Sequence, residues 1–183
     1  SQSEHGPDSQ SVLVCTSEEI ADAVAESISR QCARLKRGEI IAKALEHSRI
    51  VVLTDRDEMV DFANEYAPEH LIVSMADPWE IADRIVAAGS IFIGNYSPES
   101  AGDYASGTNH TLPTSGWAHS FSGLNLDAFM RKMTIQELSR EGLAGLGDTV
   151  RTMALAEGLD AHSAAVEVRL SDSVDEHGHF GGW

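Results

Sequence analysis

The fold is decided by the stretch from residue 90 to residue 116, which reads Ser-Ile-Phe-Ile-Gly-Asn-Tyr-Ser-Pro-Glu-Ser-Ala-Gly-Asp-Tyr-Ala-Ser-Gly-Thr-Asn-His-Thr-Leu-Pro-Thr-Ser-Gly. An apolar, strand-like run opens it, and a long segment with few aliphatic residues follows. Loops of this length inside a compact domain are usually functional or disordered. Asp103, Tyr104 and His110 have side chains that bind ligands or do chemistry, and the glycines around them allow a ligand to approach the backbone. The composition therefore favours a ligand site over a disordered connection.

Short apolar runs alternate with helical patterns on the N-terminal side of this stretch. The predicted strands are 11–15, 49–54, 71–74 and 90–93, and the predicted helices are 16–35, 39–47, 56–66 and 78–88. The first helix begins with a capping box in which Thr16 is the N-cap and Glu19 lies three residues later. This alternation predicts a doubly wound α/β layer with a mostly parallel sheet. Ligands of such sheets bind beyond the carboxyl ends of the strands, where the long loop leaves.

The pattern changes after the loop. Helices are predicted from about residue 139 to 158 and from 161 to 168, which indicates a small, mostly helical unit. We therefore divide the chain into an α/β segment (1–124), a helical unit (125–170) and a polar tail without periodicity (171–183), which is predicted to be disordered. His177 and His179 in this tail are interpreted as adventitious metal ligands at most.

Composition excludes several classes of function. The net charge is -16, from 29 acidic and 13 basic residues, which argues against binding to phosphate backbones or anionic membranes. No apolar run approaches the length of a membrane span and no signal peptide is visible, so a soluble, cytoplasmic protein is expected. Cys15 and Cys32 lack metal-binding spacing and are predicted to be buried free thiols.

Side chains suited to a reactive site occur as four pairs. They are Gln2 with His5, Glu69 with His70, Asp103 with His110, and Glu157 with His162. Imidazole and oxygen ligands without cysteine suit Zn²⁺ in an open, catalytic site. Neighbours on a strand face opposite ways, so Glu69 and His70 are interpreted as a general acid and base acting on different faces of a substrate.

Three of these pairs also have a simpler interpretation. His5 fits a surface histidine, Glu69 and His70 fit a polar turn before a strand, and chance can bring Glu157 near His162. No dinucleotide-binding glycine motif follows a strand, and the P-loop, nucleophile-elbow and His-Glu-x-x-His motifs are absent from the sequence. The residues alone thus predict a metal-dependent α/β enzyme site and leave its reaction open.

Four segments together resemble the histidinol dehydrogenase family over nearly all of residues 1–170. They are Ser-Glu-His-Gly-Pro-Asp-Ser-Gln at 3–10, Tyr-Ala-Pro-Glu-His-Leu at 66–71, Ser-Pro-Glu-Ser-Ala-Gly-Asp-Tyr-Ala-Ser-Gly-Thr-Asn-His-Thr-Leu-Pro-Thr at 97–114, and Met-Thr-Ile-Gln-Glu-Leu-Ser-Arg-Glu-Gly at 133–142. The resemblance implies oxidation of L-histidinol through an enzyme-held aldehyde to L-histidine, with two NAD⁺ and one water. It also implies a Rossmann-like sheet for the α/β segment.

The resemblance also implies roles for individual residues. The zinc ligands would be Gln2, His5, Asp103 and His162. His162 lies in the helical unit and would be donated by the partner subunit of a homodimer. Glu69 would activate the water that attacks the aldehyde, and His70 would take the proton from the alcohol. His110 and Glu157 would hold the substrate, with Glu157 near its ammonium group. His70 and the four zinc ligands would also contact the substrate.

The family's chain is more than twice as long as this one, and the additional part precedes Gln2. That part supplies a second Rossmann-like domain and most NAD contacts, so no cofactor-binding residues are assigned here. We expect this C-terminal portion to show little or no turnover alone. The alternative is a non-catalytic zinc- or histidinol-binding fragment, although binding alone does not need Glu69 and His70. A zinc hydrolase fits the ligand types but not the order of the motifs.

Overall fold

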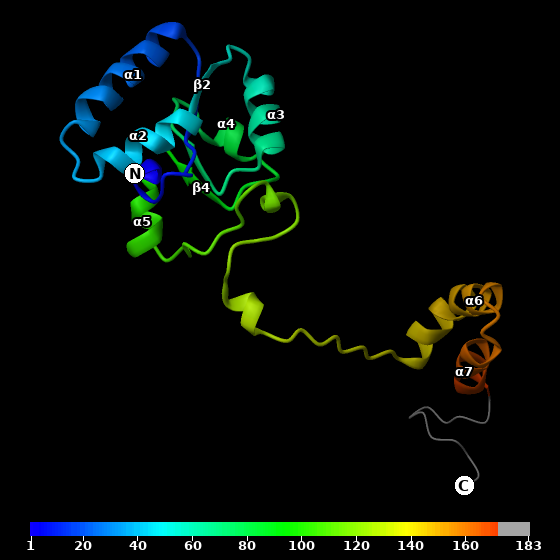
Figure 1. Cartoon of the computed structure of the whole chain (residues 1–183). Helices are drawn as coiled ribbons and strands as arrows, with labels where there is room; N and C mark the ends of the chain where they lie inside the picture. Colours follow the sequence, from blue (N-terminus) through cyan, green and yellow to red (C-terminus); the bar gives the residue numbers. More distant parts are fainter. Residues whose placement is uncertain (172–183) are drawn as a thin grey trace. The chain divides into compact units, whose positions relative to one another are not determined.

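The computed structural model describes residues 1–171 and divides the chain into two compact units, residues 1–130 and residues 131 onward (Figure 1). The boundary follows Met130, whereas the sequence suggested a boundary after residue 124. The segment between these points lies against the first unit, since Leu126 and Phe129 share a pocket with Gly89 and Leu112. The polar tail, with His177 and His179, lies outside the described residues except for Ser171.

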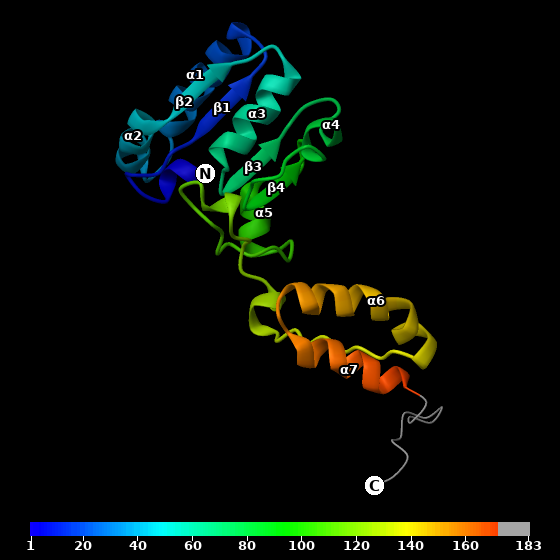
Figure 2. The ribbon, with the colours of Figure 1, turned by 90° about the vertical axis from the view of Figure 1, so that its right-hand side faces the viewer.

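The first unit alternates strands and helices, which confirms the α/β class (Figure 2). Its elements are η1 (Gln2–Glu4), β1 (Val12–Cys15), α1 (Glu18–Cys32), α2 (Gly38–His47), β2 (Arg49–Val52), α3 (Arg56–Tyr66), β3 (His70–Val73), α4 (Trp79–Ala82), β4 (Ser90–Ile93), α5 (Glu99–Tyr104), η2 (Trp117–His119) and η3 (Leu126–Phe129).

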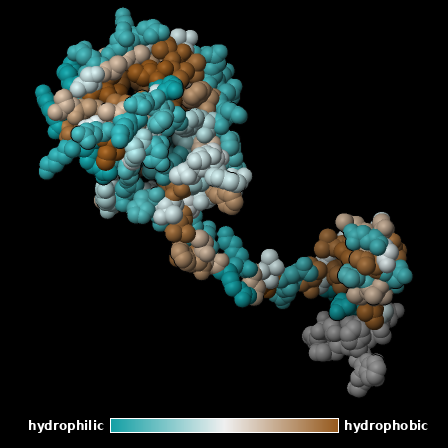
Figure 3. Space-filling model, in the orientation of Figure 1, coloured by the Kyte–Doolittle hydropathy of each residue, from teal (hydrophilic) through white to brown (hydrophobic). Residues whose placement is uncertain are grey.

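The strands pair in parallel, as the alternating pattern predicts. β1 pairs with β2 from Val12 opposite Arg49, and β3 pairs with β4 from His70 opposite Ser90. In the described part of the chain the pairs form two separate two-stranded sheets. Apolar side chains reach the surface of the unit (Figure 3), and Ile72 of β3 is 49% exposed.

Three local features differ from the sequence prediction. The N-cap of α1 is Ser17 and not Thr16, because the Ser17 hydroxyl accepts a hydrogen bond from the Ile20 amide at 3.3 Å. α4 ends at Ala82, after which the chain continues in tighter turns with bonds between residues three apart. The loop at 95–116 contains helix α5, which the sequence prediction missed.

A small core holds β3 in place. Val60 of α3, Val73 of β3 and Ile81 of α4 are buried against one another, and Leu71, Met75 and Ile85 pack on them. Both strands of this sheet therefore have a fixed position relative to α3 and α4. Cys15 is buried and Cys32 is half-buried, and both are free thiols.

The second unit contains α6 (Arg140–Ala156) and α7 (Asp160–Leu170), close to the predicted helices. The two helices pack together, and a Cβ on Gly147 of α6 would lie 3.3 Å from Leu170 and 3.4 Å from Val166 of α7. Arg151 also binds the Glu167 carboxylate at 2.9 Å. Among residues 1–171, no helix has the length and hydropathy needed to cross a bilayer.

Gly89 precedes β4 and lies close to the backbone that enters β3, so a substitution there tests how closely the two segments approach. A Cβ at this position would lie 2.5 Å from the backbone oxygen of Glu69, so the segment at Gly89 or the segment at Glu69 would have to move. We expect Gly89→Ala to lower the free energy of unfolding by about 1–3 kcal/mol, as overpacked sites do. Urea unfolding measures this.

The matched control is Gly145→Ala in α6, where a Cβ would meet no atom within 4 Å. There the better helix propensity of alanine should stabilise the protein by up to ~1 kcal/mol. Equal effects of the two substitutions would contradict the close approach at Gly89.

Candidate active site

One pocket of about 430 Å³ collects most of the candidate residues from distant parts of the sequence. It is lined by Gln2, His5, Glu69, His70, Asp103, Tyr104 and His110. The N-terminal turn, the start of β3, helix α5 and the loop after it contribute these residues. Figures 1 and 2 both show the N-terminus close to α5.

The N-terminal turn η1 presents Gln2 and His5. Its backbone closes through a bond from the His5 amide to the Gln2 carbonyl at 3.2 Å. The turn lies against α2, and the Arg37 guanidinium donates to the His5 carbonyl at 3.4 Å. Ser3 and Ser11 share a hydrogen bond of 3.1 Å between their hydroxyls, which ties the turn to the chain entering β1.

Glu69 and His70 lie where the chain enters β3. Ala67, with a φ of 49°, turns the chain out of α3, and the Ser90 amide donates to the Glu69 carbonyl at 2.9 Å. The His70 ring lies on Phe92 of β4, with ring centroids 5.9 Å apart. Strand alternation does not separate the pair, because Glu69 precedes the strand. Both side chains line the same pocket, contrary to the expectation that they face opposite ways.

The two groups are neighbours without being directly bonded. Nδ1 of His70 lies 4.0 Å from Oε2 of Glu69, and Nε2 of His70 lies 3.9 Å from Oδ1 of Asp103. The imidazole therefore lies between two carboxylates, and both distances are longer than a hydrogen bond.

At the end of α3, Tyr66 donates a hydrogen bond to Gln10, and burial raises the pKa of the Tyr66 phenol.

Helix α5 presents Asp103 to the pocket, and Gly102 lets this helix approach β4. A Cβ on Gly102 would lie 2.6 Å from the Phe92 ring, so only glycine fits without movement. The Thr108 hydroxyl donates to the Gly102 carbonyl at 3.1 Å and closes the loop behind the helix. The exposed His110 follows and lines the pocket at its edge.

The residues present fit a metal ion. The ligand atoms of His5, Glu99 and Asp103 all lie within 4.8 Å of one another. Across residues 1–171, the buried side-chain atoms without a hydrogen-bond partner are Gln2 Oε1, His70 Nε2 and Glu99 Oε1. Buried polar atoms are normally satisfied, so unpaired ones at one place indicate a missing partner. Oxygen and imidazole donors are ligands that Zn²⁺ accepts.

Glu99 is the member of this cluster that the sequence analysis did not assign. Its signal is visible once α5 is known to be helical, because Glu99 and Asp103 are four residues apart and lie on one face. Without the helix, the residue reads as one more polar side chain of the loop.

Glu157 and His162, the remaining candidates, lie in the second unit. Glu157 caps the end of α6, His162 lies in the first turn of α7, and both are exposed. They are not among the residues that line the pocket in the first unit.

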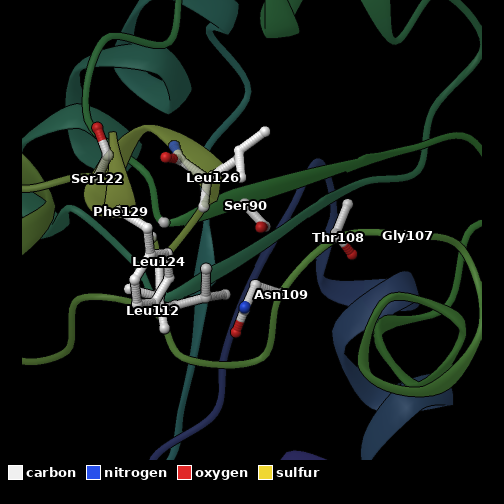
Figure 4. Close-up of a pocket in the computed structure, with 12 residues that line it drawn as sticks. Ser90, Gly107, Thr108, Asn109, Leu112, Ser122, Leu124, Leu126 and Phe129 are labelled. Atoms are coloured by element: carbon white, nitrogen blue, oxygen red, sulfur yellow. The ribbon is translucent and has the colours of Figure 1, made fainter. Parts of the chain in front are cut away.

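A second pocket, of about 620 Å³, lies at the start of β4 (Figure 4). Leu112, Leu124 and Phe129 line it together with the polar side chains of Thr108 and Asn109. None of its lining residues is acidic, basic or histidine. Acid–base chemistry in the first unit is therefore better served by the smaller pocket.

Carboxylates and imidazoles that share one pocket on an α/β frame fit the class of metal-dependent enzymes. The model of the family described as histidinol dehydrogenase matches residues 1–170. The chain is 52% identical over 171 residues to histidinol dehydrogenase of Bacteroides thetaiotaomicron and 53% identical over 173 residues to a chloroplastic histidinol dehydrogenase of Arabidopsis thaliana. This chain belongs to the histidinol dehydrogenase family.

A solved structure agrees with the match. The crystal structure of histidinol dehydrogenase from Elizabethkingia anophelis aligns with 92% of this chain at a TM-score of 0.84 and 46% identity. The alignments cover 93% and 94% of this chain in the two sequence relatives, but only 40% and 37% of their own lengths, and 39% of the solved chain. The chain thus spans about two fifths of the relatives it matches.

Proposed function

We propose that this chain supplies the metal-binding, substrate-binding and acid–base residues of a zinc- and NAD-dependent oxidation of L-histidinol to L-histidine. One observation carries the proposal: Glu69 and His70 line the same pocket as Gln2, His5 and Asp103. The relatives' printed names support the choice of substrate.

Gln2, His5 and Asp103 would hold zinc, with His162 of the partner subunit as the fourth ligand in a homodimer. The unpaired Oε1 of Gln2 and the three-residue cluster support a metal in this pocket. Bound zinc would supply Lewis-acid chemistry that orients the substrate and screens charge. The exposure of His162 on α7 is compatible with donation to another subunit.

His70 would act as the base in the first oxidation. Its Nε2 is buried and makes no hydrogen bond to the protein, so no protein donor would occupy the lone pair that takes the alcohol proton. NAD⁺, when bound, would supply the hydride acceptor for this step, and His70 would hold the proton that leaves the alcohol oxygen as the aldehyde forms.

Glu69 would act in the second oxidation. Its carboxylate would take a proton from water as the water oxygen bonds to the aldehyde carbon. Loss of hydride from the resulting hydrate anion would yield the carboxylic acid of histidine, with a second NAD⁺ as the hydride acceptor. Because Glu69 and His70 adjoin in one pocket, the two proton acceptors would serve the same bound substrate.

His110 and Glu157 would position the substrate. His110 lies at the edge of the pocket, where it can contact the substrate without blocking its entry. The carboxylate of Glu157 suits the substrate's ammonium group. We place the reaction in the cytoplasm, although one relative is named chloroplastic.

A chimera tests the proposal. This chain replaces the matching segment of the Bacteroides thetaiotaomicron relative, to which it is 52% identical. We expect the chimera to form NADH from L-histidinol and to lose this activity when a chelator removes zinc. A folded, zinc-loaded chimera without histidinol-dependent NADH formation would overturn the proposal.

A further inference from the structure

Glu99 is a buried acidic residue, and one of its carboxylate oxygens, Oε1, has no hydrogen-bond partner. Its residue exposure is 6%, and its Oε1 atom makes no hydrogen bond. An ionised carboxylate removed from water without compensation is strongly unfavourable. A native protein retains such a group where something absent from the chain itself satisfies it, such as a bound ion.

The neighbours of Glu99 indicate the kind of partner that would satisfy its carboxylate. Glu99 begins α5, and Asp103 lies four residues later on the same face of the helix. On its other side, Oε1 of Glu99 lies 3.7 Å from Nε2 of His5. The carboxylate thus adjoins two of the residues assigned to zinc.

The distance between His5 and Glu99 is compatible with a shared ion. Two ligands each bound to zinc at about 2.1 Å can be at most ~4.2 Å apart. The separation of 3.7 Å falls inside this limit, so the two atoms can contact one ion without movement. It is too long for a hydrogen bond, so the His5 ring does not satisfy the carboxylate itself.

We propose that Glu99 belongs to the metal centre, as a second carboxylate that faces the ion beside Asp103. The inference rests on the proposed zinc site and adds a residue to its four ligands. Among the ligands of that site, Asp103 alone is anionic. A second carboxylate neutralises the remaining charge of a divalent ion, and this compensates for the burial of Glu99.

Zinc binding to this chain tests the inference, with Zn²⁺ alone as the probe. Competition against a chromophoric chelator gives the affinity of the wild type, Glu99→Gln and His5→Ala. Glu46→Gln on the exposed face of α2 is the matched control. We expect Glu99→Gln to weaken zinc binding by about 10- to 100-fold, the range seen when groups supporting a metal site are lost, and Glu46→Gln to leave it unchanged.

Thermal unfolding separates this role from a structural one. Without zinc, Glu99→Gln should melt at the wild-type temperature or above it, because the change removes a buried charge. With zinc, its melting temperature should rise less than that of the wild type. Loss of stability without zinc, together with unchanged zinc affinity, would assign Glu99 a packing role and overturn the inference.

The outcomes distinguish this inference from the proposed function. If His5→Ala loses zinc but Glu99→Gln binds it as tightly as Glu46→Gln, the zinc site stands and the role of Glu99 is refuted. If the folded wild type does not bind zinc, or His5→Ala binds it equally well, the metal site itself is refuted and Glu99 loses its proposed partner.

Discussion

Glu69→Gln in the chimera is expected to stop histidine formation while the first oxidation of histidinol continues. The amide keeps the size of the side chain but cannot take a proton from water. Loss of a positioned acid or base typically costs about 10²- to 10⁴-fold in rate. A single-turnover experiment should therefore show one NADH formed quickly per site, with the second slowed by this factor.

His70→Gln should slow the first oxidation and spare the second, the reverse of Glu69→Gln. Its imidazole, which lies beside Phe92 and has a buried Nε2 without a hydrogen-bond partner, is the proposed acceptor of the alcohol proton. The first NADH from histidinol should then be slowed about 10²- to 10⁴-fold, while supplied aldehyde should still be oxidised. Glu65→Gln, at an exposed position of α3, is the control and should behave as the wild type. Equal slowing of both steps by both pocket variants would refute the division of roles.

His5→Ala is expected to produce the second large effect, the loss of bound zinc. The His5 ring follows a turn that packs against α2. It forms a cluster of possible metal ligands with Glu99 and Asp103. Removing one ligand leaves the two carboxylates without the neutral donor beside them. After dialysis, metal analysis should find the wild type loaded with zinc and the variant almost free of it.

The control for this prediction is His47→Ala, an exposed histidine at the end of α2. It should retain wild-type zinc, and its unfolding should match that of His5→Ala measured without metal. Full zinc in His5→Ala would remove His5 from the site and with it the proposed arrangement of ligands.

Local patterns predicted most of the fold. β4, for example, coincides with its predicted strand at residues 90–93, a short apolar run that ends at Gly94. The sequence does not predict helix α5, because Gly102 lowers the helix propensity of this segment. A glycine is needed there because the helix approaches the Phe92 ring closely, and such a contact between elements is not visible in a local pattern. The separation of the strands into two pairs also depends on such contacts.

The candidate site was predicted in part. Its residue types and the resemblance named the side chains, and the structure brings Gln2, His5, Glu69, His70, Asp103 and His110 to one pocket. Sequence reasoning failed for Glu99, whose burial appears only after η1 packs beside α5. It also separated Glu69 from His70, because strand alternation was applied one residue too early.

Anomalous diffraction at the zinc absorption edge, from crystals of the chimera grown with zinc and L-histidinol, tests the central claim most directly. The claim is that residues of η1 and α5 join the acid–base pair around one metal-bound substrate. We expect one anomalous peak per site, at about 2.0–2.2 Å from Gln2 Oε1, the Asp103 carboxylate and the imidazoles of His5 and of His162 of the partner subunit, with the substrate alcohol facing His70. A zinc peak elsewhere, or histidinol bound away from His70 and Glu69, would contradict it.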